Sequence, residues 1–369
     1  RVRACVRVWR ARVVNAELKT AGRSDTLHIK GQRAEWYAPA SLEGLRQVMQ
    51  RHPAAKLVVG NTEVGIEQRF LNKDYPVLIS LNRVKALHAV VCNPAEVRIG
   101  SCANLTHVND ALKDFLAENP SSEQFIKPIL DQLHWFSGTS IRNGACVGGN
   151  IATASPISDL NPVWVALGAE FVIIDAAAGT CRTVPAHAFF KEKYRAVDLQ
   201  AGEVLTEVIL PIPPADGETQ FFAKAFKQSR RREDDIAIVT ACMSVEIAGN
   251  QVQKCRLSFG GMAPYTKLAK KTQGFLEGKK WSMAVLEEAL AMMEREMFLP
   301  AGVPGGMATY RTALCTSLLY KFYCYVQAQL DASALTKQEL TAIAPLSTSQ
   351  PLQGKQEWFC QPDYPVHVP

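Results

Sequence analysis

Two glycine-containing stretches of the chain combine small residues with hydrogen-bonding groups. The first, KLVVGNTEVG at 56–65, places Gly60, Asn61 and Thr62 directly after a β-branched run. Several backbone N–H groups can converge on one anion in such a loop, which is typical of a phosphate nest. The stretch is neither a P-loop nor the GxGxxG dinucleotide fingerprint. An ordinary hairpin turn is the alternative interpretation of this stretch alone.

The second stretch is CVGGNIATASPISDLNP at 146–162. Gly148 and Gly149 remove side chains where a ligand would have to approach the backbone closely. The polar groups that could bond hydroxyls or phosphate oxygens are those of Asn150, Thr153, Ser155, Ser158 and Asp159. A dinucleotide, with its pyrophosphate and polyol arms, requires such a combination more than a single nucleotide does. A solvated loop is the alternative.

Two further stretches carry weaker signals. In LHWFSG at 133–138, Trp135 and Phe136 could lie over a planar ring, although core packing is the better interpretation of both residues without context. QSRRREDDIAIV at 228–239 sets three arginines beside three acids, a pattern that is usually a solvated face or an ion-pair network.

The elements that must position these stretches follow from the apolar pattern. A strand and then a helix capped by Ser41 are expected between residues 34 and 53. Further strands are expected at 57–59, 76–81, 88–91, 96–100, 163–175 and 203–211, and helices after Thr106 and over 123–136. This part of the chain therefore reads as α/β.

PIPPADGETQ at 211–220 is typical of a domain boundary, because prolines and turn residues separate two clean strands there. Beyond it, two alternating strands joined by a hairpin at Gly249-Asn250 precede three helices, the last over 309–330. Residues 1 to about 34 read as a basic linker or strand remnant, and the polar segment after 331 as a linker or tail.

Composition argues against several function classes. The net charge of +6 is too evenly spread to favour a nucleic-acid surface. Ten cysteines without a CxxC pair indicate free thiols in a reducing compartment, so a cytoplasmic protein is expected. Seven scattered histidines without HxxxH or HExxH give no indication of a protein-built metal site. No apolar run is long enough to span a bilayer, so no membrane partner is expected.

Taken together, KLVVGNTEVGIE, LHWFSGTSIRN, VGGNIATASPISDLNP, KQSRRREDDIAIV and PGGM (304–307) resemble the FAD-binding region of the molybdenum hydroxylase family, in its xanthine dehydrogenase branch. The resemblance implies an α+β fold: a linker at 1–33, a two-subdomain FAD-binding domain of the vanillyl-alcohol-oxidase (p-cresol methylhydroxylase) type at 34–213, and a small α+β domain at 221–330 like that of carbon monoxide dehydrogenase flavoproteins. Residues 331–369 would lead toward a molybdenum-cofactor domain missing from this chain.

The resemblance also implies a set of residues that contact FAD. They are Leu57, Val58, Val59, Gly60, Asn61, Thr62, Glu63, Val64, Phe136, Cys146, Gly149, Asn150, Thr153, Ser155, Ser158, Asp159, Leu205 and Lys227. The implied neighbours of a nicotinamide are Glu63, Tyr194 and Asp234. The sequence departs from the family at two of these regions, since Cys146 stands where the family usually has Ser, and His134 where it usually has Arg.

By the same resemblance, the domain takes electrons from iron–sulfur clusters and passes them at the flavin to NAD or oxygen, in an enzyme of purine catabolism that is a homodimer. The iron–sulfur and molybdenum domains are the expected partners, and their Cys-rich motifs do not occur in this chain. Three alternatives are an aldehyde oxidase FAD domain, a cofactor-free docking or dimerisation module, and a generic nucleotide-binding α/β protein.

Overall fold

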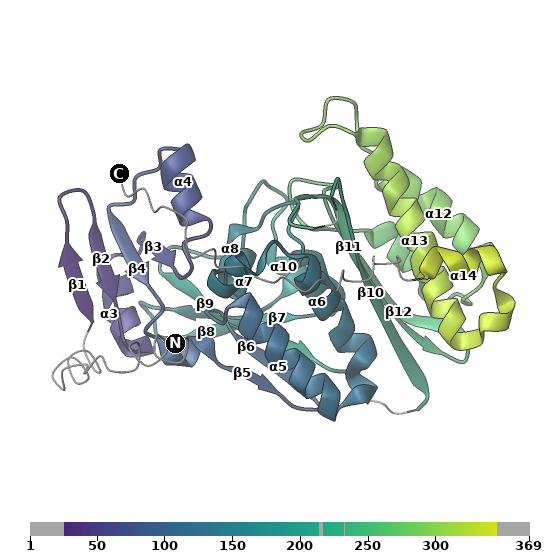
Figure 1. Ribbon diagram of the computed structural model, residues 1–369, viewed down its shortest axis with the longest axis horizontal. Helices are drawn as coiled ribbons and strands as arrows, with labels where there is room; N and C mark the ends of the chain where they lie inside the picture. Colours follow the sequence, from purple (N-terminus) through teal and green to yellow (C-terminus); the bar gives the residue numbers. More distant parts are fainter. Residues whose placement is uncertain (1–25, 214–216, 232, 345–369) are drawn as a thin grey trace, which may run out of the picture.

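The computed structural model describes residues 26–213, 217–231 and 233–344. Within them the strands form three sheets, which follow one another along the long axis of the molecule (Figure 1). Helices cover each sheet, so the fold is α+β, as the sequence predicts. None of the helices in the described ranges combines the length and apolar content that a membrane crossing requires.

The first sheet has the strand order β1-β2-β4-β3. Its elements are β1 (Leu27–Lys30), β2 (Glu35–Ala38), α3 (Leu42–Arg51), β3 (Lys56–Val58), α4 (Val64–Phe70) and β4 (Val77–Ser80). The predicted cap of the first helix is confirmed, since the Ser41 hydroxyl accepts a bond from the Gly44 N–H at 3.0 Å. Strands β3 and β4 are parallel, so the hairpin interpretation of 56–65 is wrong: the stretch is a strand, a loop and a helix.

A buried carboxylate holds α4 in place beneath this loop. Glu67 accepts bonds from the Tyr75 hydroxyl at 2.6 Å and from Lys73 at 3.2 Å, and it pairs with Lys56 at 3.0 Å. Burial alone would raise the pKa of Glu67, but its three partners outweigh burial and lower the pKa to about 2. The helix that follows the 57–65 loop is therefore fixed by a charged, fully partnered anchor.

The second sheet has the order β5-β6-β9-β7-β8, and its pairings are antiparallel. Its strands are β5 (Val90–Cys92), β6 (Glu96–Gly100), β7 (Glu170–Asp175), β8 (Cys181–Pro185) and β9 (Glu203–Pro211). The helical segments are η1 (Lys85–His88), α5 (Leu105–Glu118), η2 (Pro120–Ser122), α6 (Glu123–Trp135), α7 (Thr139–Gly144), α8 (Val147–Thr153), α9 (Asn161–Ala166) and α10 (Ala186–Phe189).

Two predictions for this region need correction. The expected strand over 163–175 is helical in its first part, where α9 forms, and becomes strand only at Glu170. Pro162 in the first turn favours the helix, and a continuous apolar run does not distinguish a buried helix from a buried strand. The helix expected after Thr106 begins two residues earlier, at Leu105, because Asn104 is its cap: the Asn104 side chain accepts from the His107 N–H at 2.7 Å.

The third sheet has the order β10-β11-β12-β13. Its elements are β10 (Thr219–Ser229), β11 (Ala237–Ala248), β12 (Gln251–Gly260), β13 (Lys267–Leu268), α11 (Lys270–Leu276), α12 (Met283–Glu296), α13 (Ala308–Asp331), η3 (Ala332–Ala334) and α14 (Lys337–Ile343). The predicted hairpin is confirmed, with φ of 53° at Gly249 and 64° at Asn250, as a tight two-residue turn requires. Figure 1 shows the helices α12, α13 and α14 packed at the far end from β1.

The ends of the described chain carry more structure than a linker would. β1 pairs with β2 within the segment expected to be a linker or strand remnant. After residue 331, η3 and α14 continue the fold, and a capping box between Thr336 and Glu339 begins α14. The rest of the two expected linkers, at 1–25 and 345–369, lies outside the described residues, as do 214–216 of the expected boundary.

Replacing Glu67 by Gln should destabilise the chain by roughly 3 kcal/mol at pH 7, because the substitution leaves two lysines facing an uncharged amide. The folded pKa is depressed from 4.5 to about 2, so the contribution of the carboxylate is present above pH 4.5 and is lost as the pH falls toward 2. Urea unfolding at pH 7 and at pH 3 should therefore show a difference between variant and wild type that narrows at the lower pH.

The matched control is Glu43→Gln, which breaks an exposed pair with Arg46 at 2.9 Å on α3. It should change the free energy of unfolding by about 0.5 kcal/mol or less. Equal effects of the two substitutions at pH 7 would contradict the anchoring role of Glu67.

Candidate functional site

The loop after β3 lies directly against the start of the second glycine stretch. A Cβ atom on Gly60 would lie 1.7 Å from the carbonyl oxygen of Gly144, so only glycine allows the two backbones to approach this closely. Asn61 has a φ of 58° and so turns the chain toward α4. The Leu81 N–H donates to the Val58 carbonyl at 3.0 Å, and the Asn82 side chain donates to the Val59 carbonyl at 3.1 Å. The two stretches singled out in the sequence are thus adjacent in space.

The two glycines of the second stretch have different roles. Gly148 is buried and packs on Ser101: its N–H donates to the Ser101 carbonyl at 2.7 Å, and a Cβ would lie 2.6 Å from the Ser101 Cβ. The expected reason for this glycine, close approach of a ligand, is therefore wrong, because the neighbouring backbone occupies that space. Gly149 is exposed, and its N–H is bonded to the Cys146 Sγ at 3.2 Å.

Cys146 caps the short helix α8 with its sulfur. The thiol is buried, and burial raises its pKa, so it remains protonated at neutral pH. The capping bond to Gly149 is the kind that a serine hydroxyl makes at the same position of a helix. The departure from the family at this residue therefore keeps the local backbone geometry.

The polar residues after α8 bond mostly to one another. The Ser158 hydroxyl donates to the Asn150 side chain at 3.0 Å and accepts from the Asn161 N–H at 3.2 Å. The Ile157 N–H donates to the Ser155 hydroxyl at 3.4 Å. Thr153 is half-buried at the end of α8. These bonds hold the turn rigid.

The third sheet holds this turn from the other side. The Thr240 hydroxyl on β11 donates to the Ser158 carbonyl at 3.0 Å, and the Gly261 N–H donates to the Pro156 carbonyl at 2.7 Å. At the C-terminal end of α6, the Gln132 side chain donates to the Phe226 carbonyl of β10 at 2.9 Å. The site therefore lies where the second and third sheets meet.

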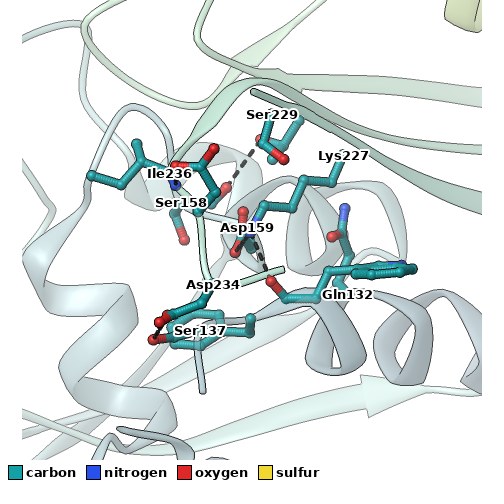
Figure 2. A network of polar contacts seen from close by, with 12 residues as sticks. Gln132, Ser137, Ser158, Asp159, Lys227, Ser229, Asp234 and Ile236 are labelled. Carbon is teal, nitrogen blue, oxygen red and sulfur yellow. Dashed lines mark hydrogen bonds and ion pairs between the residues drawn. The ribbon is translucent and has the colours of Figure 1, made fainter. Parts of the chain in front are cut away.

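The centre of this junction is a buried ion pair, which Figure 2 shows between Lys227 and Asp159. Lys227 Nζ lies 2.7 Å from the Asp159 carboxylate and donates to the Trp135 carbonyl at 2.8 Å. The two side chains are 5% and 11% exposed. Burial raises the pKa of Asp159 to about 6, although Lys227 acts in the opposite direction. One lysine thus joins β10, the end of α6 and the 155–159 turn.

The aromatic residues at the end of α6 are only partly buried. Phe136 packs against the core of the second sheet, and the exposed His134 contacts Trp135 edge-on at 4.5 Å between ring centroids. Arg142 donates to the Phe136 carbonyl at 2.8 Å and so fixes the start of α7 against α6. Leu205, from β9, is buried in the core of the second sheet.

The three residues expected beside a nicotinamide fall into two groups. Glu63, at the end of the first loop, forms an ion pair with Arg195, whose guanidinium carbon lies 5.6 Å from the centre of the Tyr194 ring. Tyr194 is 65% exposed. Asp234 is held separately by the Ser137 hydroxyl at 3.0 Å, as Figure 2 shows. The contacts thus join Glu63 with Tyr194 through Arg195, and Asp234 with the end of α6.

Sequence reasoning missed two residues of this site. Gly144 supplies the backbone against which Gly60 packs, and Arg195 supplies the partner of Glu63. Neither belongs to the quoted glycine stretches, and only their positions in the folded chain reveal them. Within the described ranges, no three His, Cys, Asp or Glu side chains lie close enough to hold a metal ion.

These residues fit a dinucleotide cofactor. The close backbone contact at Gly60 and the exposed Gly149 place two residues without side chains in the two stretches. The half-buried aromatic ring at Phe136 and the Lys227–Asp159 pair lie at the end of α6, beside the 155–159 turn. The donor set comprises backbone amides, hydroxyls, one carboxylate and one ammonium group, which is the chemistry that phosphate and polyol groups require.

Comparisons with known families cover most of the chain. Residues 31–213 match the family model described as the FAD binding domain in molybdopterin dehydrogenase, and residues 224–326 match the CO dehydrogenase flavoprotein C-terminal domain. The chain is 41% identical over 313 residues to xanthine dehydrogenase from Oryza sativa subsp. japonica, covering 83% of this chain and 22% of that protein. It is 42% identical over 306 residues to xanthine dehydrogenase/oxidase from Gallus gallus, covering 82% and 22%.

Solved structures show the same fold. Carbon monoxide dehydrogenase from Hydrogenophaga pseudoflava gives a TM-score of 0.67 at 24% identity, over 79% of this chain and 96% of that one. Quinoline 2-oxidoreductase from Pseudomonas putida 86 gives 0.65 at 21% identity, over 86% and 100%. The chain spans about a fifth of the length of the curated relatives that it matches. It belongs to the xanthine dehydrogenase family of molybdenum hydroxylases, as the FAD-binding flavoprotein region of such an enzyme.

Proposed function

We propose that the two adjacent loops form an FAD site in which the residues implied by the family resemblance hold the cofactor. The observation that carries this proposal is the backbone contact between Gly60 and Gly144, because it joins the first loop to the second. Backbone N–H groups of residues 57–65 bind the pyrophosphate. Asn150, Thr153, Ser155 and Asp159 bind the polyol and phosphate groups, Phe136 lies against the ring, and Leu205 and Lys227 make single contacts.

FAD, when bound, supplies the two-electron chemistry of an oxidoreductase. We propose that this chain carries the electron-transfer step of a xanthine dehydrogenase that acts in purine catabolism in the cytoplasm, with iron–sulfur clusters as donors and NAD or oxygen as acceptor. Its partners are the iron–sulfur and molybdenum-cofactor domains of the same enzyme, which acts as a homodimer. The residues of this chain bind and orient the flavin and exclude water from Lys227 and Asp159.

Glu63, Tyr194 and Asp234 are proposed neighbours of the nicotinamide. The exposure of the Tyr194 ring supports this role, since a planar ligand can reach it from solvent. A cofactor-free docking module is the less favoured function, because the substituted residue Cys146 still makes the capping bond that orders α8.

Replacing Asp159 by Asn should weaken FAD binding about tenfold or more, because Lys227 then loses its counter-charge while it remains buried. The raised pKa adds a pH dependence. Asp159 is charged above pH 6, so the pair with Lys227 is present there, and FAD retention should decline as the pH falls through about 6. The Asp159→Asn protein should lack this inflection. Fluorescence titration of FAD into the flavin-free chain between pH 5 and pH 8 measures both effects.

The matched control is Asp131→Asn. Asp131, on α6, pairs with Lys224 of the same strand β10 at 3.3 Å, but both side chains are about 30% exposed. Its replacement should leave the FAD dissociation constant within about twofold of the wild type. If both variants bound FAD equally well, or if the wild type showed no inflection near pH 6, the assignment of Asp159 would be wrong.

Replacing Cys146 by Ser should retain FAD binding, since a hydroxyl can accept the Gly149 N–H as the sulfur does. Replacing it by Ala removes the acceptor and should cost about 0.5–2 kcal/mol of stability, as loss of a helix N-cap does. The melting temperatures of the wild type, Cys146→Ser and Cys146→Ala, measured with and without FAD, test both expectations. A Cys146→Ala protein as stable as Cys146→Ser would show that the sulfur does not act as a cap.

The full 369-residue chain can be used to test whether it carries electron transfer at the flavin without the purine hydroxylation of the whole enzyme. Loaded with FAD, it should oxidise NADH with an artificial electron-accepting dye but should form no urate from xanthine. Absorbance of the dye and liquid chromatography of the purines measure the two reactions. Urate formation would contradict the proposal, as would protein that released no flavin on denaturation and bound none when supplied.

A further inference from the structure

The proposed FAD site lacks enough positive charge for its ligand. A pyrophosphate group carries two negative charges at neutral pH, whereas the proposed contacts include the acids Glu63 and Asp159. Their cation, Lys227, is already paired with Asp159. Backbone N–H groups contribute partial charges only, and anion sites in proteins are commonly completed by an arginine or a lysine. A further cation beside the 57–65 loop would therefore strengthen the binding of a pyrophosphate.

Arg195 is a cation that the structure places against this loop. It lies in the turn between Lys191 and Ala196, which is closed by a bond from the Lys191 N–H to the Ala196 carbonyl at 3.0 Å. The turn belongs to the second sheet, and Arg195 reaches from it to Glu63, which ends the loop of the first sheet. The contact thus joins the two subdomains at the loop proposed to bind pyrophosphate.

The guanidinium of Arg195 has bonding capacity that Glu63 does not use. Nη1 donates to Glu63, while the Nε–H is buried and has no acceptor. A buried donor without an acceptor costs about 1–3 kcal/mol, which the ion pair alone does not explain. The side chains of Arg195 and Glu63 are 32% and 35% exposed, so an anion can reach the pair from solvent. Burial is the largest single influence and lowers the pKa of Arg195, but Glu63 and Tyr194 together outweigh burial and raise the pKa.

The backbone of Arg195 is also strained, with a φ of 55° that is uncommon for a residue other than glycine. Such conformations persist where the surrounding structure holds a side chain in a functional position. The planar fork of a guanidinium matches two oxygens of a phosphate group, which an ammonium group does not. Strain and charge both point to the same ligand chemistry.

We propose that Arg195 binds the pyrophosphate of a dinucleotide at the 57–65 loop, with Glu63 holding the guanidinium in position. This inference rests on the proposed FAD site and adds a residue to it. Two dinucleotides could supply the pyrophosphate, FAD itself or the NAD that accepts electrons. The experiment below distinguishes them, because FAD binding is measured on the flavin-free chain and ADP-ribose, which carries the pyrophosphate of NAD, is titrated into the FAD-loaded chain.

The variants are Arg195→Met, which removes the charge, and Arg195→Lys, which keeps the charge but lacks the fork. Lys193→Met is the control, since it removes an exposed charge from the same turn. Arg195→Met should weaken binding of FAD, or of ADP-ribose, about 10- to 100-fold, as does the loss of a hydrogen bond to a charged group. Arg195→Lys should lie between Arg195→Met and the wild type. Lys193→Met should match the wild type.

Inorganic pyrophosphate separates ligand binding from a purely structural role. It should raise the melting temperature of the flavin-free wild type and of Lys193→Met, but not that of Arg195→Met. Arg195→Met could bind FAD weakly and yet be stabilised by pyrophosphate as much as the wild type. In that case Arg195 would only hold the loop in its conformation, and the inference would be overturned. Unchanged affinities for both FAD and ADP-ribose would overturn it too.

If Arg195→Met did not fold, the role of Arg195 would be tested with Arg195→Lys, by its affinity for FAD and ADP-ribose and by its stabilisation by pyrophosphate. A loss of affinity of about threefold or more, with reduced stabilisation by pyrophosphate, supports the inference, and wild-type values contradict it. A wild-type chain that failed to bind FAD would refute the proposed function itself. A wild-type chain that bound FAD, with equal binding of FAD and of ADP-ribose by every Arg195 variant, would refute the role of Arg195 alone.

Discussion

A lysine in a protein interior needs a counter-charge and hydrogen-bond acceptors, and in this chain Lys227 obtains the first from Asp159 and a further acceptor from the Trp135 carbonyl. These partners come from two segments that are separated by the whole of α7 and α8. Because the cost of an unpaired buried ammonium group is several kcal/mol, the pair fixes how β10 lies against α6 and the 155–159 turn. The relative position of the second and third sheets, and so the shape of the cofactor site, depends on this contact.

The first loop is held by a different kind of constraint. Gly60 and Gly144 bring two backbones together without any side chain between them, and on the other side of the loop Glu67 fixes α4 through three polar partners. The loop is thus confined at both ends, which aligns its N–H groups before a ligand binds. Preorganisation of this kind favours binding because fewer degrees of freedom are lost on association.

The site contains two ion pairs that differ in their exposure to solvent. Asp159 and Lys227 neutralise each other in a buried location, whereas Glu63 and Arg195 do so where solvent has access. The accessible pair lies beside the exposed ring of Tyr194, so it is the region that a second ligand can approach. A flavoprotein that binds one dinucleotide permanently and another transiently requires such a difference in accessibility.

The sequence by itself determined the α+β fold class, the family and many local features of the chain. The cap at Ser41, the strand at 203–211 and the hairpin at Gly249-Asn250 follow from interactions within a few residues, which sequence patterns record directly. The secondary-structure prediction failed where one local pattern is compatible with both a helix and a strand. The apolar run at 163–175 is nearly continuous, so its periodicity does not distinguish helix from strand, and Pro162 in the first turn favours the helix α9.

Only the tertiary structure decided which residues meet. Gly148 carries no mark in the sequence that separates it from Gly149, yet one packs on Ser101 and the other faces outward. Glu63 and Arg195 are 132 positions apart, and Asp159 and Lys227 are 68 apart. Their pairing depends on how three sheets pack together, and the energy of that packing is distributed over the whole core rather than encoded near either residue. The sequence therefore identified the loops of the site, whereas the fold determined the charges that complete it.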